Sequence, residues 1–227
     1  MPIVTLAVLF GSAVIGLMAS SDTTPRCGAP ATRDATPAEV RAYFEAQGKQ
    51  VLTFLGYSGA GYEDEAALLR HAGAVLDQVE PRTTIVNIGA TPEGVGRVYE
   101  LAKQRGFATT GIVSTQARDA NVGLSPCVDQ VFFIRDSSWG GFEPGSERLS
   151  PTSDAMVGVS DRLVAIGGGE VSRDELLAAR RAGKTVTFIP ADMNHRAAIE
   201  KAAKKGQPPP ADFRGPVHAA FGAEAKP

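Results

Sequence analysis

Short apolar runs that alternate with amphipathic stretches constrain the fold of this chain more than any other feature of its sequence. The apolar runs are predicted strands and fall at 51–57, 83–89, 107–114, 128–134, 162–167 and 185–190. The amphipathic stretches are predicted helices at 38–47, 63–79, 91–106, 152–160, 172–182 and 194–204. Strands that are apolar throughout are buried on both faces of a sheet. We therefore predict an α/β fold, a three-layer sandwich with a mainly parallel sheet.

The chain divides into a core and flanking segments. Within residues 1–20, the uncharged apolar run at 3–19 is typical of a signal peptide or an N-terminal membrane anchor. Residues 21–37 are a predicted linker, the core domain is expected at 38–205, and residues 206–227 are a predicted Pro-rich, irregular tail. Because no Lys or Arg precedes the apolar run, a buried N-terminal strand and helix stays open as the alternative.

The N-terminal run also bears on location. We expect an exported or membrane-anchored protein, with a cytoplasmic one as the alternative. An oxidising compartment would allow Cys27 and Cys127 to pair, whereas in the cytoplasm they would be two unrelated thiols.

Composition excludes several classes of protein. The chain has 23 Lys and Arg against 25 Asp and Glu, a formal net charge of -2. It therefore lacks the positive field of a general nucleic-acid binder, and we expect no nucleic-acid partner. The two cysteines form no CxxC pair, and His71, His195 and His218 lie far apart. We therefore expect no metal, and no motif requires a cofactor.

The first glycine-rich turn, GYSGAGYED at 56–64, follows the first predicted core strand. Ligands of open parallel sheets bind outside the carboxyl ends of strands, so Gly56, Ser58 and Gly59 are candidate ligand-binding residues. The turn is not the dinucleotide fingerprint, because Asp64 stands at the third glycine position. A turn whose acidic residues complement the positive end of the next helix is an equal alternative.

The same turn comes within one residue of the G-x-S-x-G nucleophile elbow. Asp192 and His195 follow it, in the order Ser, Asp, His. A serine hydrolase using Ser58 is therefore a less favoured alternative, because the sequence lacks an HGG-type oxyanion loop. His195 is explained more simply as a first-turn helix residue next to an N-cap at Asn194.

A second glycine-bearing strand end is NIGATPEGVG at 87–96. It supplies Gly89 and Glu93 as candidate ligand-binding residues, on a strand expected to neighbour the first. Thr91 and Pro92 are predicted to be the N-cap and first residue of the next helix. Close packing of two backbones explains these glycines equally well.

The third strand end is the most specific. The predicted strand at 162–167 delivers Gly167, Gly168 and Gly169 to its carboxyl end, before a helix that begins near Ser172. Glycines and free helix amides together suit an anion, so Gly168, Gly169 and Ser172 are candidate phosphate-binding residues. A flexible turn is the alternative.

The segment GGGEVSRDE at 167–175 resembles the P-G-G-x-G-T-x-x-E motif of the LOG proteins. These are cytokinin-activating phosphoribohydrolases, once labelled lysine decarboxylases, within the SLOG superfamily of Rossmann-like nucleotide-binding domains. Gly168 and Gly169 match the paired glycines, Ser172 replaces the threonine and Glu175 matches the glutamate.

The resemblance extends through most of residues 51–204, in LGYSG, VNIGATPEGVG, GIVS and GVSDRLVAIGG. It implies a Rossmann-like domain for a nucleotide-derived or phosphoribosyl ligand, a homodimer, and Glu175 as a catalytic carboxylate at an N-glycosidic bond. Thr152 and Ser153 replace the Arg-Lys pair of that family, and Arg148 is a weak substitute.

Trp139 lies in a long predicted loop and offers a stacking face for a base; packing as a loop anchor is the alternative. Because the Arg-Lys pair is missing, we expect a sensor or binding module for a nucleotide-derived ligand. A nucleotide N-glycosidase that uses Glu175 is the alternative.

Overall fold

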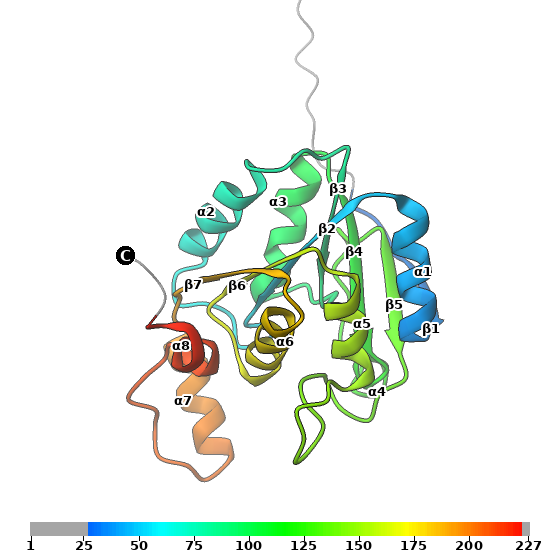
Figure 1. The fold of residues 1–227 in the computed structure, drawn as a ribbon. Helices are drawn as coiled ribbons and strands as arrows, with labels where there is room; N and C mark the ends of the chain where they lie inside the picture. Colours follow the sequence, from blue (N-terminus) through cyan, green and yellow to red (C-terminus); the bar gives the residue numbers. More distant parts are fainter. Residues whose placement is uncertain (1–26, 224–227) are drawn as a thin grey trace, which may run out of the picture.

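Parallel pairing of seven strands organises the protein, in a computed structural model that describes residues 27–223 (Figure 1). The strands are β1 (Ala31–Ala35), β2 (Gln50–Gly56), β3 (Thr84–Ile88), β4 (Ala108–Ser114), β5 (Gln130–Ile134), β6 (Arg162–Ile166) and β7 (Thr185–Ile189). Their order is β1-β5-β4-β3-β2-β6-β7, and all neighbours run parallel. The predicted α/β fold with a mainly parallel sheet is confirmed.

Helices cover both faces of this sheet. They are α1 (Pro37–Gln47), α2 (Glu65–Leu76), the 3-10 helix η1 (Gly94–Arg97), α3 (Val98–Gln104), α4 (Gln116–Asp119), α5 (Pro151–Val159), α6 (Glu170–Arg181), α7 (His195–Lys204) and α8 (Gly215–Phe221). The apolar cluster on one face takes its helical residues from α2, η1, α3 and α4. The cluster on the other face takes them from α1, α5, α6 and α8, which completes the three layers.

The central strand β2 explains why the strand sequences are apolar throughout. Successive side chains of a strand point to opposite faces of the sheet. Leu52 and Phe54 therefore pack into one core cluster, whereas Val51 and Leu55 pack into the other. All four are buried, so neither face of the strand tolerates a charged residue.

The order of the strands reverses at β2. From β2 the chain moves outward through β3, β4 and β5, and then returns to pair β6 with the other edge of β2. Because α2 and α6 follow these two strands on opposite faces, they leave a crevice at the carboxyl ends of the strands. This switch point is where open parallel sheets bind ligands.

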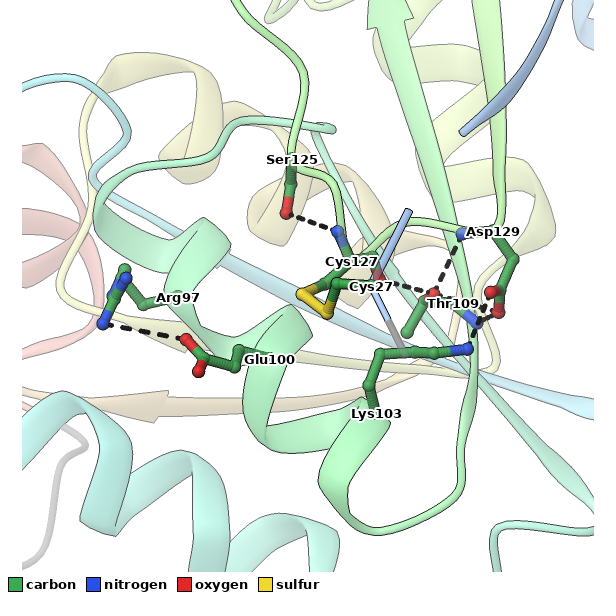
Figure 2. The surroundings of a disulfide bond; sticks show 8 residues. All are labelled: Cys27, Arg97, Glu100, Lys103, Thr109, Ser125, Cys127 and Asp129. Atoms are coloured by element: carbon green, nitrogen blue, oxygen red, sulfur yellow. Dashed lines mark hydrogen bonds and ion pairs between the residues drawn. A yellow bond between two sulfur atoms is a disulfide. The ribbon is translucent and has the colours of Figure 1, made fainter. Parts of the chain in front are cut away.

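The predicted linker contains an edge strand. Its segment ATRDA forms β1, which pairs in parallel with β5. The prediction missed it because these residues are mostly exposed and carry no apolar pattern. A disulfide between Cys27 and Cys127, whose Cα atoms are 4.4 Å apart, ties the chain just before β1 to the segment that leads into β5 (Figure 2). The paired state of the two cysteines is therefore the one present.

The prediction of an irregular C-terminal tail is wrong for residues 215–221, which form α8. Val217 and Phe221 are four residues apart, lie on one face of this short helix and are buried in the core. The prediction missed the helix because two apolar positions make no recognisable period, and because the helix depends on its contacts with α6.

One predicted helix start, at Thr91, is wrong. Thr91 caps no helix: its hydroxyl accepts a hydrogen bond from the Glu93 N–H, and η1 begins only at Gly94. Helix α6 begins at Glu170, within two residues of the predicted start near Ser172. The expected N-cap of α7 is confirmed, because its asparagine side chain accepts a hydrogen bond from the Ala197 N–H at 3.0 Å.

Within residues 27–223, no helix is both long enough and apolar enough to cross a bilayer. The apolar run at 3–19, predicted as a signal peptide or anchor, lies outside the described residues.

Candidate functional site

A cavity of about 440 Å³ lies at the carboxyl ends of β2, β3 and β4, beside the first turn of α6. It therefore sits at the switch point of the sheet, and its volume is typical of a small-molecule site. The predicted site residues that line it are Gly56, Ser58, Gly59, Gly89, Glu93, Trp139, Ser172 and Glu175. The structure thus brings residues from two predicted turns, a distant loop and a helix to one place.

The glycines that line this cavity differ in how closely their neighbours approach them. A Cβ atom at Gly56 would lie 2.0 Å from the Tyr62 hydroxyl, which donates a 2.7 Å hydrogen bond to the Ile166 carbonyl. Gly56 is therefore required for packing between the ends of β2 and β6. By contrast, a Cβ at Gly89 would meet nothing within 4 Å, and one at Gly59 only a Glu93 oxygen at 4.0 Å. These two glycines leave open space.

Glu175 lies at the inner end of the cavity and is 4% exposed. The Ser153 hydroxyl donates a 2.7 Å hydrogen bond to Glu175 Oε1 and accepts one from the Gly141 N–H, also at 2.7 Å. Burial raises the pKa of Glu175 to about 7, and the nearby charge of Asp174 acts in the same direction. The hydrogen bond from Ser153 opposes both effects and lowers the pKa. A pKa raised toward neutrality suits a group that transfers protons.

Sequence reasoning missed how Thr152 and Ser153 contribute. Ser153 fixes Glu175, while Thr152 lines the cavity, and its backbone N–H donates a 2.9 Å hydrogen bond to Asp136 Oδ2. The signal was present, because these are the positions that the LOG proteins fill with an Arg-Lys pair. Hydroxyl groups there leave the cavity without the positive charges of that pair.

Trp139 stands at the rim of the cavity and is 50% exposed, so it is not a core anchor. The residues on either side of it are held in place. Ser138 donates two hydrogen bonds to Asp136 Oδ1, at 2.8 and 2.9 Å, and the Gly140 N–H donates to the Ser138 hydroxyl. Hydrogen bonds therefore hold the backbone around Trp139, while half of the residue surface stays exposed to solvent.

The predicted phosphate cradle takes a different form. The Ser172 hydroxyl donates to the Gly56 carbonyl at 3.1 Å, so it braces two elements. Gly168 and Gly169 are not among the residues that line the cavity. At Gly168 the backbone has φ +129°, and a Cβ would lie 2.8 Å from both Ser172 and Val217 of α8. Helix α8 therefore covers the glycine turn.

Arg148 lies away from the cavity. Its side chain is 78% exposed and forms an ion pair with Glu143, on a surface groove between the segment 143–151 and α6. It does not meet Glu175, which is the contact that a substitute for the family's arginine would need.

The serine-hydrolase alternative lacks its triad. His195 Nε2 lies 3.3 Å from Asp192 Oδ2, and its ring stacks on Phe213 with centroids 4.0 Å apart. Among the described residues, no hydrogen bond joins this ring to the exposed Ser58 hydroxyl. The residues of the predicted triad are thus present without the contact that would activate the serine.

Comparisons with known proteins give distant matches. No family model and no curated protein matches the chain. The X-ray structure of TM1055, a structural genomics target, has 20% identity and a TM-score of 0.43, over 60% of this chain and 72% of that one. The Moco carrier protein of Chlamydomonas reinhardtii has 20% identity and a TM-score of 0.43, over 78% of this chain and 99% of that one. At these values the similarity assigns no function to this chain.

Proposed function

We propose that the cavity binds a small nucleotide-derived ligand and that the protein acts as a binding or sensing module. One observation carries the proposal. Residues chosen from separate sequence motifs, at the ends of β2 and β3, at Trp139 and in α6, line a single cavity at the switch point. The walls are mostly apolar with a few polar groups, which is the usual composition of a small-molecule site.

A thermal-shift panel tests the proposal. The probes are the common nucleobases, their nucleosides and their 5′-monophosphates, and we expect at least one to raise the midpoint of unfolding. Gly89→Leu should abolish that rise by filling the open space, whereas Gly28→Leu, at a site with equal room outside the cavity, should preserve it. A panel without any shift would contradict the proposal.

Glu175 supports a second candidate function, cleavage of an N-glycosidic bond. Its carboxyl group is buried in the cavity with a pKa of about 7. As a carboxylate it is able to stabilise an oxocarbenium-like state while the C–N bond breaks and water adds to the anomeric carbon, with the proton that the water loses ending on the departing base. The Glu175→Gln variant should then stop the release of free base while binding stays measurable. Absence of release by the wild-type protein, across nucleosides and monophosphates, would exclude this candidate.

We also propose that the protein is exported or membrane-anchored. The Cys27–Cys127 disulfide supports an oxidising compartment, as does the apolar run at 3–19 in the sequence. Thiol trapping in intact cells should find both cysteines oxidised. Cell fractionation should recover the protein in the exported or membrane fraction rather than in the cytoplasmic one. Recovery of the protein in the cytoplasmic fraction with reduced cysteines would contradict this proposal and support a cytoplasmic location.

A further inference from the structure

The charges that line the cavity are all of one kind. Among residues 27–223, no Lys, Arg or His side chain lines it, whereas the carboxyl groups of Glu93 and Glu175 do. Arg173 pairs with Asp174 at 2.8 Å and Arg148 with Glu143, while the exposed Arg135 lies outside the cavity lining. An anionic group inside the cavity would face the carboxyl groups of Glu93 and Glu175, and no side-chain cation of the described residues lines the cavity to compensate.

The glycine turn that follows β6 does not offer the missing anion site. The Val217 N–H of α8 donates a 3.3 Å hydrogen bond to the Gly168 carbonyl. The Tyr57 hydroxyl donates to the Arg214 carbonyl at 2.8 Å, which fixes the chain just before α8. A Cβ at Gly215 would lie 2.8 Å from the Gly168 carbonyl. The protein's own C-terminal helix therefore fills the space that a phosphate group would need beside Gly168.

The start of α6 is also partly engaged. A phosphate cradle would use the Ser172 hydroxyl as a donor, but this hydroxyl donates its hydrogen bond to the Gly56 carbonyl. The positive end of the α6 dipole remains beside the cavity, but no cation from the described part of the chain lines the cavity and the Ser172 hydroxyl is already hydrogen-bonded.

The remaining groups suit an uncharged heterocycle. Phe54, Ile88 and Met156 contribute apolar walls, and Trp139 offers an aromatic face at the rim. The exposed Ser58 residue also lines the cavity, and its hydroxyl is able to donate one hydrogen bond to the edge of a ring or accept one from it. Aromatic stacking together with a few polar contacts is how proteins commonly hold a base.

We propose that the cavity takes an unphosphorylated purine or pyrimidine, as the free base or the nucleoside, in preference to the corresponding 5′-monophosphate. The inference rests on the proposed function and narrows its ligand class. It differs from what the motif resemblance implies, because that resemblance points to a phosphate at Gly168 and Gly169.

Matched pairs test this preference. Adenosine, guanosine, cytidine and uridine are each compared with their 5′-monophosphate by isothermal titration of the full chain. At least one nucleoside should bind about tenfold or more tightly than its monophosphate, and inorganic phosphate should neither bind nor compete. Glu93→Gln removes a negative charge at the rim of the cavity. It should therefore strengthen binding of the monophosphate and reduce the difference in affinity between nucleoside and monophosphate.

The outcomes separate the two proposals. If a monophosphate binds as tightly as its nucleoside or more tightly, the preference for the nucleoside is overturned while the proposed function stands. If Arg135→Ala then loses that binding, the phosphate group contacts this exposed cation outside the cavity lining. If no base, nucleoside or monophosphate binds, the proposed function itself fails. A stronger discrimination in Glu93→Gln would contradict the electrostatic explanation.

Discussion

Glu175 is a buried carboxyl group at the cavity. Its folded-state pKa of about 7 lies above its ordinary value of 4.5, because the buried site disfavours the charged form. Stability from this group is therefore fully present below the unfolded pKa, and it is lost as the pH rises through about 7. Over that range the shift corresponds to a loss of at most about 3 kcal/mol.

The Glu175→Gln variant should remove this pH dependence. Near about pH 5 its unfolding free energy should be close to that of the wild type, whereas near about pH 8 the variant should be more stable, by up to about 3 kcal/mol. Chemical denaturation at the two pH values measures the difference. Glu170→Gln, an exposed change on the same helix, should keep the wild-type pH dependence. A wild type whose stability is flat across this range would contradict the assigned environment.

Several site residues were predictable one by one, but their partners were not. The motif GGGEVSRDE identified Ser172 and Glu175, which line the cavity. The hydrogen bond from Ser153 to Glu175 joins residues 22 positions apart, and no local pattern encodes it. In the same way, Gly168 fits a phosphate cradle locally, yet Val217 covers it because of packing that depends on a distant helix.

At the scale of elements, α8 and the turn before α6 depend on each other. At Gly168 a side chain would meet Ser172 and Val217, and the backbone φ of +129° is unfavourable for any residue except glycine. At Gly169 the backbone is extended, and a Cβ would meet nothing within 4 Å.

We expect Gly168→Ser to lower the free energy of unfolding by about 2 kcal/mol or more and to loosen α8. The matched Gly169→Ser, at the N-cap of α6, should be neutral or slightly stabilising. Denaturant titration gives the two values, and amide hydrogen exchange of α8 gives the local effect. Equal losses in the two variants would contradict the packing described.

Tyr62 joins the ends of β2 and β6. Its buried hydroxyl donates to the Ile166 carbonyl and accepts from the Tyr57 N–H at 3.1 Å. Tyr62→Phe should therefore destabilise the protein by about 1–3 kcal/mol, because two buried polar groups lose a partner. Tyr43, which packs through its ring on Phe44, provides the control, and Tyr43→Phe should change stability by a few tenths of that amount. The account fails here if the two changes have equal effects.

Most elements were predictable because each buries a periodic apolar pattern. Two of the exceptions share a cause. Strand β1 is an exposed edge strand, defined by its pairing with β5, and α8 is a short helix, defined by its packing on α6. Their structure comes from contacts with other elements, which a single sequence does not display.

At the scale of the whole molecule, the disulfide ties the start of the described chain to the middle. It joins residues 100 positions apart, so it restricts the unfolded chain strongly. Reduction should lower the free energy of unfolding by about 2–5 kcal/mol. Thermal unfolding with and without reductant measures this, and a Cys27→Ser, Cys127→Ser double variant should not respond to reductant. Unchanged stability after verified reduction would contradict this role.

The central claim is that the cavity at the strand ends binds a small heterocycle. The chain contains one tryptophan, Trp139, and this residue stands at the rim of the cavity. A titration of its fluorescence with bases and nucleosides is therefore the most direct measurement. The account predicts a saturable change for at least one of them, absent in Gly89→Leu. A folded wild-type protein whose emission stays unchanged throughout the panel would contradict the account.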